Sequence, residues 1–277
     1  MHNHSRSKPS NNILFISHGG GPMPLLGDPG HQEMVFQLKT IAGALPRPSA
    51  ILVISAHWEE TVPTITSGAS PSLIYDYFGF PPESYLIEYP CPGEPVLAVQ
   101  IHQALEQAGI TARLDEHRGF DHGLFVPLKL MYPAADIPCV QLSLVTSLNA
   151  ATHLAIGRAL QALECENLLV IGSGFSFHNM RAFFAADTPD IQAGNAAFEY
   201  WLKETCSSTD IKEPERAERL VHWEHAPYAR LCHPREEHLL PLHVCYGLAE
   251  KPCSTHISAT ILGKKSGIVY WGPESLV

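Results

Sequence analysis

Several features that mark specialised protein classes are missing from this 277-residue sequence. No apolar run of about 18 residues could span a bilayer, and the polar residues 1–10 lack the apolar centre of a secretory signal. None of the seven cysteines forms a CxxC pair, and several lie in apolar stretches where a reduced thiol packs as a small hydrophobe. These absences argue against a membrane or secreted protein and favour a reducing cytoplasm.

Basic residues are also scarce, because 18 Lys and Arg stand against 28 Asp and Glu and leave a net charge of -10. Nucleic acid or an anionic membrane is therefore not an expected partner, whereas a small molecule is. The glycine run at 19–21 lacks the GxGxxG and GxxxxGK spacings of nucleotide sites, and no GxSxG nucleophile elbow occurs. No partner surface for a second copy can be read from the sequence, so the oligomeric state stays open.

Three short apolar runs, each followed by a histidine, organise the chain. Residues 13–16 lead to His18, residues 51–54 lead to His57, and residues 168–171 lead to His178. Such runs are typical of strands buried on both faces, and the carboxyl ends of parallel strands form the crevice where α/β proteins bind ligands. The pattern therefore predicts that these histidines meet at one edge of a sheet.

The rest of the sequence alternates helical and strand-like patterns, with 45% hydrophobic residues to form a core. We expect an α/β fold: a single domain with a central, largely parallel or mixed sheet flanked by helices. Residues 1–10 are expected to be a disordered leader and residues 11–277 a single catalytic domain. The expected helices cover 30–45, 94–108, 124–131, 150–163 and 193–206, with a further one that opens at 233 and has Pro234 in its first turn. A strand is expected at 137–144, an exposed stretch at 207–219, and a terminal hairpin of strands 255–262 and 267–271 joined by 263–267.

The aromatic, proline-rich segment 62–93 has two interpretations. It could be a surface loop stiffened by its prolines, or it could form a pocket wall against which a flat ring stacks. The sequence does not favour either one.

His18, His57 and His238 form the candidate metal-ligand set, because imidazole suits zinc, iron, copper and nickel. His178 is either a fourth ligand or an acid/base residue, since histidine titrates near neutral pH. Glu237 precedes His238 directly, so either of the two could face inward. The loop Asp121-His122 has glycines on both sides, and its two side chains could tune one another or reach separate partners. Of the remaining histidines, His102 is expected to be structural and those of the leader to be solvated, and the others lie on helix faces or in polar segments without a convergent context.

Eight blocks of the sequence, in order, resemble the motifs of the class III extradiol ring-cleavage dioxygenases, in particular the DOPA 4,5-dioxygenase type. They are SHGGG at 17–21, SAHW at 55–58, YFGFP at 77–81, YPCPG at 89–93, GFDHG at 119–123, MYPAADIP at 131–138, GSG at 172–174 with HN at 178–179, and EHLLPL at 237–242. Each block alone is weak, but together they run through almost the whole chain.

The resemblance implies a mononuclear Fe(II) site in the active enzyme, although members of this branch are also recovered with zinc. By position, His18, His57 and His238 resemble metal ligands, His178 a ligand or acid/base residue, and His122 a substrate-contacting or proton-handling residue. The better-known branch uses two histidines and a glutamate, whereas a third histidine here would raise the charge of the site by one. The implied reaction inserts O2 into a catechol-type ring, DOPA-like or another small catechol, and gives a ring-opened semialdehyde.

Two other functions fit a histidine-rich site. A zinc-dependent hydrolase would activate water and turn over without O2. A non-catalytic binding protein of the same fold would bind a metal or ligand without turnover, because fold does not fix function.

Overall fold

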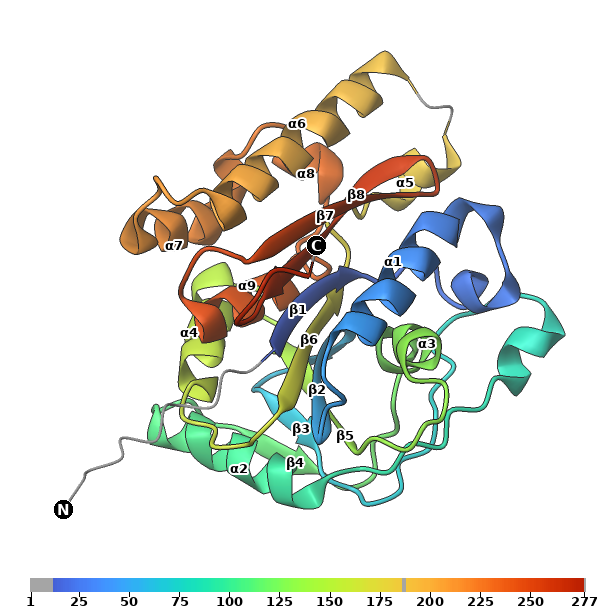
Figure 1. The fold of residues 1–277 in the computed structure, drawn as a ribbon, viewed down its shortest axis with the longest axis vertical. Coiled ribbons are helices and arrows are strands. Elements are labelled where there is room, and N and C mark those ends of the chain that lie inside the picture. Colours follow the sequence, from blue (N-terminus) through green and yellow to red (C-terminus); the bar gives the residue numbers. More distant parts are fainter. Residues whose placement is uncertain (1–11, 186–187, 277) are drawn as a thin grey trace.

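A computed structural model describes residues 12–185 and 188–276, in which a single mixed sheet forms the centre of the molecule (Figure 1). The order of its eight strands is β4-β3-β5-β2-β6-β1-β8-β7. The strands are β1 (Asn12–Ser17), β2 (Ala50–Glu60), β3 (Thr64–Thr66), β4 (Arg113–Asp115), β5 (Cys139–Val145), β6 (Leu168–Gly174), β7 (Thr255–Ile261) and β8 (Lys264–Trp271). The expected α/β fold class is therefore confirmed, and the expected leader at 1–10 lies outside the described residues.

The four central strands β5, β2, β6 and β1 are mutually parallel, so their carboxyl ends lie at one edge of the sheet. All residues of β1, β5 and β6 are buried, as their unbroken apolar runs predict. β8 pairs antiparallel with β1, and β7 pairs antiparallel with β8, which extends the sheet on that side.

Helices cover both faces of this sheet (Figure 1). α1 (Gln32–Ala44) and α3 (His122–Met131) pack on one face, and α2 (Pro95–Gln107), α4 (Ala150–Leu160) and α9 (Leu240–Ala249) pack on the other. The remaining helical segments are η1 (Met23–Leu26), η2 (Pro29–His31), η3 (Pro82–Leu86), α5 (Met180–Phe184), α6 (Pro189–Ser207), α7 (Glu213–Val221), η4 (Trp223–His225) and α8 (Ala229–Cys232). No helix among the described residues is long and apolar enough to cross a membrane.

Three local expectations are wrong. The helix expected from 233 begins only at Leu240, because residues 233–239 form turns. The stretch 207–219 is not simply exposed: α7 starts within it, and the Arg216 guanidinium is fully buried and donates to the backbone carbonyls of Ser208 and Ile211. The hairpin turn is only two residues long, Leu262 and Gly263, whose positive φ angles of 49° and 77° match the twist of the flanking strands.

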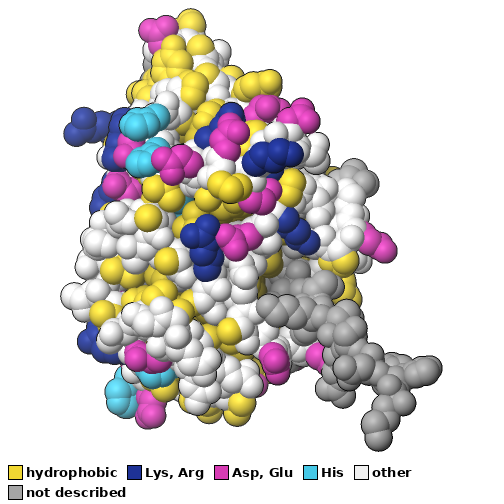
Figure 2. All heavy atoms as spheres, turned by 90° about the vertical axis from the view of Figure 1, so that its left-hand side faces the viewer, with side chains coloured by type: hydrophobic (Ala, Val, Ile, Leu, Met, Phe, Trp, Pro, Cys, Tyr) yellow, Lys and Arg dark blue, Asp and Glu magenta, His cyan; other side chains and the backbone are white. Residues whose placement is uncertain are grey.

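The exterior carries interspersed charges, as the face in Figure 2 shows, where acidic side chains lie beside basic ones over the outer helices. Several are paired, for example Arg219 with Glu215 at 2.6 Å and Arg158 with Glu250 at 2.7 Å. Such exposed pairs contribute little to stability, with a typical magnitude of about 0–1 kcal/mol.

Candidate functional site

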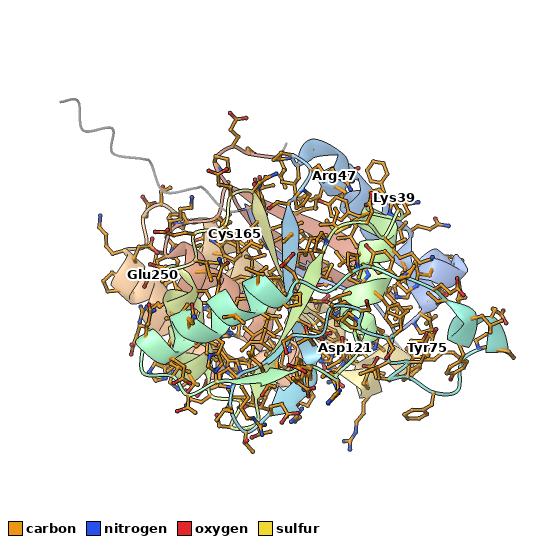
Figure 3. The ribbon with its side chains drawn as sticks, turned by 90° about the horizontal axis from the view of Figure 1, so that it is seen from below. Lys39, Arg47, Tyr75, Asp121, Cys165 and Glu250 are labelled. Atoms are coloured by element: carbon orange, nitrogen blue, oxygen red, sulfur yellow. The ribbon has the colours of Figure 1, made fainter. Side chains whose placement is uncertain are left out.

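The parallel strands β1, β2 and β6 bring three of the candidate histidines, His18, His57 and His178, to one edge of the sheet. Asp121 and Tyr75, which border this edge, lie at one end of the sheet in Figure 3, while Arg47 and Cys165, which precede β2 and β6, lie at the other. The strand register explains the convergence, because Ser17 of β1 pairs with Gly174 of β6, and Ser173 of β6 pairs with Ser55 of β2.

His18 directly follows β1, whereas His57 lies inside β2. The pairing of β2 with β5 shifts between Ile54 and Glu59, so His57 sits in an irregular part of the strand. Irregularities of this kind re-aim side chains next to functional sites.

A cavity of about 270 Å³ opens at this edge. All five candidate histidines line it: His18, His57, His122, His178 and His238. The other lining residues are glycine or carry aromatic or aliphatic side chains: Gly19, Gly20, Gly21, Met23, Tyr77, Phe80, Phe175, Met180, Phe183, Phe184 and Leu262. Tyr77 and Phe80 come from the segment 62–93, so part of that segment is a pocket wall.

Ser173 fixes the orientation of the His18 ring. The Ser173 hydroxyl donates to the carbonyl oxygen of Gly123 at 2.5 Å, so its oxygen is left to accept a hydrogen bond from His18 Nδ1 at 3.0 Å. A neutral imidazole with its proton on Nδ1 carries a lone pair on Nε2. The lone pair of His18 Nε2 therefore faces the pocket.

The Nε2 atom of His57 also faces the pocket. Its Nδ1 lies 3.6 Å from the Asp76 carboxylate, which favours a proton on Nδ1 and a lone pair on Nε2. The Nε2 atoms of His57 and His18 are 3.0 Å apart. Two lone pairs at this distance repel one another unless a positive charge lies between them or beside them.

His238 is oriented by the residue that precedes it. Glu237 Oε1 accepts from His238 Nδ1 at 2.8 Å and lies 3.1 Å from Nδ1 of His178. The two imidazole rings stack with centroids 3.4 Å apart. Burial acts to raise the pKa of Glu237, but the hydrogen bonds from His178 and His238 outweigh it and hold that pKa well below its usual range. Glu237 is thus an ionised carboxylate behind the two rings.

The protonation states of the three candidate ligands suit a cation. Burial, reinforced by the neighbouring imidazoles, lowers the pKa of His18 and His57 well below 6.5, and burial lowers that of His238 to about 3. All three rings are therefore neutral at pH 7, which is the form that binds metal. One nitrogen atom from each lies within 4.8 Å of the others, so the three could hold one metal ion. Metal–nitrogen bonds of about 2.0–2.1 Å are compatible with the 3.0 Å separation of the first two atoms.

His122 begins α3 instead of lying in a loop, and Asp76 holds it in place. The Asp76 carboxylate accepts from the backbone N of His122 at 2.9 Å and from its Nδ1 at 2.8 Å. Burial acts to raise the pKa of Asp76, but the hydrogen bonds from His122 outweigh it and lower that pKa. The neighbouring Asp121 points away from the pocket, where it accepts from the Ser55 hydroxyl at 2.8 Å and pairs with Arg118.

Two glycines allow the elements to approach closely enough for this arrangement. A side chain at Gly123 would come within 2.6 Å of Ser55 Oγ and 3.2 Å of His57 Cδ2. A side chain at Gly174 would come within 2.1 Å of the carbonyl oxygen of His238. Both positions therefore require the absence of Cβ.

The structure brings together all five histidines singled out from the sequence, but it adds Asp76 and Ser173, which were not predicted. Asp76 could have been suspected as an acidic residue directly flanked by two tyrosines, and Ser173 as the middle residue of the GSG block at 172–174. The histidines that the sequence leaves outside the candidate site include His31 and His153. Both ring nitrogens of each are already occupied by hydrogen bonds within the protein.

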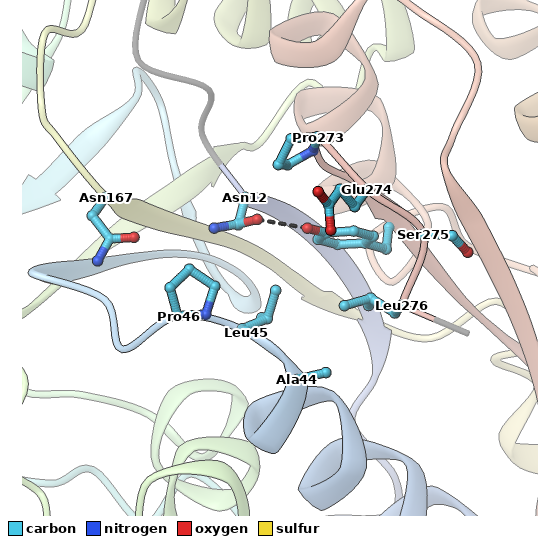
Figure 4. Close-up of a pocket in the computed structure, with 10 residues that line it drawn as sticks. Asn12, Ala44, Leu45, Pro46, Asn167, Pro273, Glu274, Ser275 and Leu276 are labelled. Carbon is cyan, nitrogen blue, oxygen red and sulfur yellow. Dashed lines mark hydrogen bonds between the residues drawn. The ribbon is translucent and has the colours of Figure 1, made fainter.

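A second, larger cavity of about 370 Å³ lies at the opposite end of the sheet (Figure 4). It is lined by Asn12, Ala44, Leu45, Pro46, Asn167, Tyr270, Pro273, Glu274, Ser275 and Leu276. The Tyr270 hydroxyl donates to Asn12 Oδ1 at 2.6 Å, and Glu274 is the only acidic or basic side chain among the described residues of this lining. These described residues do not include a group that could hold a metal ion.

Comparison with known proteins agrees with this geometry. Residues 12–265 match the family model described as the catalytic LigB subunit of aromatic ring-opening dioxygenase. The chain is 41% identical to the dioxygenase tasH of Hapsidospora irregularis, over 94% of this chain and 85% of that protein. It is 38% identical to a 4,5-DOPA dioxygenase extradiol of Portulaca grandiflora, over 84% of each chain, and 34% identical to one of Escherichia coli K12, over 91% of each.

The fold also matches a crystal structure of an uncharacterized protein from Escherichia coli K12. The TM-score is 0.73 at 31% sequence identity, and the match covers 94% of this chain and 99% of the other. The sequence comparison and the structure comparison therefore each find relatives that match most of this chain.

Proposed function

Because this chain belongs to the LigB family of aromatic ring-opening dioxygenases and is an extradiol ring-cleavage dioxygenase, we propose that it uses Fe(II) to open a small catechol. His18, His57 and His238 would hold the ion. The observation that supports this most directly is the convergence of three neutral imidazoles, two of whose Nε2 atoms lie 3.0 Å apart. Bound Fe(II) would supply the redox-active centre that brings the catechol and O2 together. Zinc suits the same ligands and is expected in protein isolated without added iron.

His178 takes a proton from a catechol hydroxyl in this proposal. Its Nδ1 faces Glu237 at 3.1 Å, so the proton sits on that nitrogen and Nε2 is free to accept another. The ionised Glu237 carboxylate then stabilises the imidazolium that forms. This role uses His178 as a general base and leaves the metal to the other three histidines.

His122 is the second proton-handling residue. Asp76 holds its Nδ1 at 2.8 Å, so its Nε2 is available to accept or return a proton in the pocket. Each of the two histidines therefore has its own carboxylate, which fixes the ring tautomer and orientation.

The aromatic side chains position the ring of the substrate and exclude water. Phe175 lies edge-on to His18, with ring centroids 6.3 Å apart, and Tyr77 lies edge-on to His122 at 5.6 Å. A flat ring between them would make offset or edge-to-face contacts. We further propose that residues 11–277 act as one catalytic domain in a reducing cytoplasm, where the seven free cysteines stay reduced.

The test is to purify the protein anaerobically, reconstitute it with Fe(II), and follow O2 uptake and visible absorbance on addition of DOPA, caffeate and protocatechuate. Stoichiometric O2 uptake with a yellow ring-opened product, lost in His57→Ala, is expected. His153→Asn is the matched control, because His153 is buried and lies outside the pocket. Absence of O2 uptake with every catechol, despite bound iron, would contradict the proposal.

A further inference from the structure

The pocket is chemically divided into two parts. The polar side chains of its described lining are the five histidines and Tyr77. The Tyr77 hydroxyl donates to the carbonyl oxygen of Ser84 at 2.6 Å, so it is already engaged outside the pocket. Away from the histidines, the described lining is formed by glycine, methionine, leucine and phenylalanine.

No lysine or arginine belongs to the lining among the residues that the structure describes. Arg118 pairs with Asp121 and stacks on Trp58, and Arg235 binds Glu59 through two hydrogen bonds of 2.6 and 2.7 Å. Both guanidinium groups therefore have carboxylate partners of their own.

The apolar character continues to the mouth of the pocket. Met180 and Phe184 of α5 line it and are also 52% and 84% exposed. Arg181, which lies between them in sequence, is exposed and does not line the pocket. A substituent that points from the histidines toward solvent would therefore pass only apolar surface.

The size of the cavity agrees with a substituted ring. A cavity of roughly 150 Å³ holds benzene, so about 270 Å³ leaves room for a substituent of similar size to the ring. A charged substituent there would lose hydration without gaining a counter-charge, which is strongly unfavourable. The net charge of -10 opposes an anionic substituent in addition.

From this division we infer, on the basis of the proposed function, that the substrate is a catechol whose ring carries a neutral, apolar substituent. The diol lies at the histidines, and the substituent lies along Phe80, Phe183 and Met180 toward the mouth. This separates the chain from relatives whose names specify DOPA, a catechol with a carboxylate and an ammonium group on its side chain.

The first test compares protocatechuate with its methyl ester, which have the same ring and a similar electron-withdrawing group but differ in charge. With 4-ethylcatechol and DOPA as a second pair, kcat/KM for each neutral member should exceed that of the charged member by at least ~10-fold. The same order is expected in the Kd values of the zinc-loaded protein, measured anaerobically by calorimetry. Equal or better binding and turnover of the charged members would overturn the inference.

Two neighbouring positions supply matched variants. Met180→Arg places a cation in the lining and should raise kcat/KM for protocatechuate relative to its ester by ~10-fold. Arg181→Ala should leave this ratio unchanged. A selective loss of protocatechuate or DOPA turnover in Arg181→Ala would show that Arg181 binds the carboxylate and would contradict the inference.

The outcomes separate this inference from the proposed function. Turnover of charged and neutral catechols at equal rates contradicts only the substrate class. If no catechol supports O2 uptake, the proposed function fails, and the Kd values of the zinc-loaded protein still decide which substituents the pocket accepts.

Discussion

The two cavities at opposite ends of the parallel strands differ in chemistry more than in size. The cavity at the amino ends is the larger, at about 370 against 270 Å³, but the described residues that line it include a single acidic side chain and no histidine. The smaller one holds five histidines, because the strands and the loops that follow them end in polar residues there. The direction of the strands, and not the volume of a hollow, therefore locates the candidate active site.

The largest expected difference in activity is between two variants at opposite ends of β1. His18→Ala should abolish metal binding and lower kcat/KM by at least ~10³-fold, because a metal contributes several kcal/mol to catalysis. Asn12→Ala, at the other end of β1, should keep both the metal binding and the kcat/KM of the unmodified protein. Elemental analysis after dialysis and O2 uptake measure the two quantities. Full metal content in His18→Ala would remove this residue from the ligand set.

Glu237→Gln tests the role of the carboxylate that accepts hydrogen bonds from the His178 and His238 rings. The amide has nearly the same shape but cannot stabilise an imidazolium at His178, so kcat/KM and metal affinity should fall by about 10–100-fold. Competition with a chelator measures the affinity. Unchanged kinetics across pH 6–9 would show that the carboxylate has no role in proton transfer.

Glu199 of α6 gives a pH-dependent stability effect near the same edge. It is buried against Gly267, whose backbone N donates to Ser176 Oγ at 2.6 Å. Burial raises the pKa of Glu199 from 4.5 to about 8. The folded state thus keeps a proton that the unfolded state releases. The contribution of Glu199 to the free energy of unfolding is therefore complete below pH 4.5 and is lost as pH rises through 8.

Glu199→Gln cannot ionise and should lack this dependence. Relative to the unmodified protein, its free energy of unfolding should gain on the order of a few kcal/mol between pH 5 and pH 8.5. Urea unfolding at the two pH values measures the difference. A constant difference would mean that Glu199 is already ionised in the folded protein.

The smallest effect is expected at the amino-end cavity. Tyr270→Phe removes the hydrogen bond to Asn12 and should lower the free energy of unfolding by about 1 kcal/mol. It should leave kcat/KM for every catechol unchanged. A selective change in turnover would connect the two cavities and break the contrast between them.

Much of the fold could be predicted from periodicity alone. The buried runs of β1, β2 and β6 and the helix α2 lie where their patterns place them, since burial on both faces of a strand demands an unbroken apolar run. The start of α9 could not be predicted. Pro234 fits a first turn, but residues 233–239 form turns in which His238 reaches the pocket and its carbonyl accepts from the backbone N of Phe175.

His18 and His57 could be predicted from their position after apolar runs, and His238 from its position before an apolar run together with the resemblance to a family. The roles of Asp76 and Ser173, which orient these histidines, could not be predicted, because both residues act on residues far away in the sequence. Asp76 lies 46 positions from His122, and Ser173 lies 155 positions from His18. Hydrogen bonds across such separations leave no periodic trace in a sequence.

The sequence by itself determined that the chain builds an α/β sheet and that histidines follow its strands, because local periodicity and chain direction are written residue by residue. Only the tertiary structure decided which nitrogen of each histidine ring faces the pocket. It also decided that the pocket lining away from the histidines is apolar. Both depend on contacts between segments that are distant in the chain, and on burial, which no single segment controls.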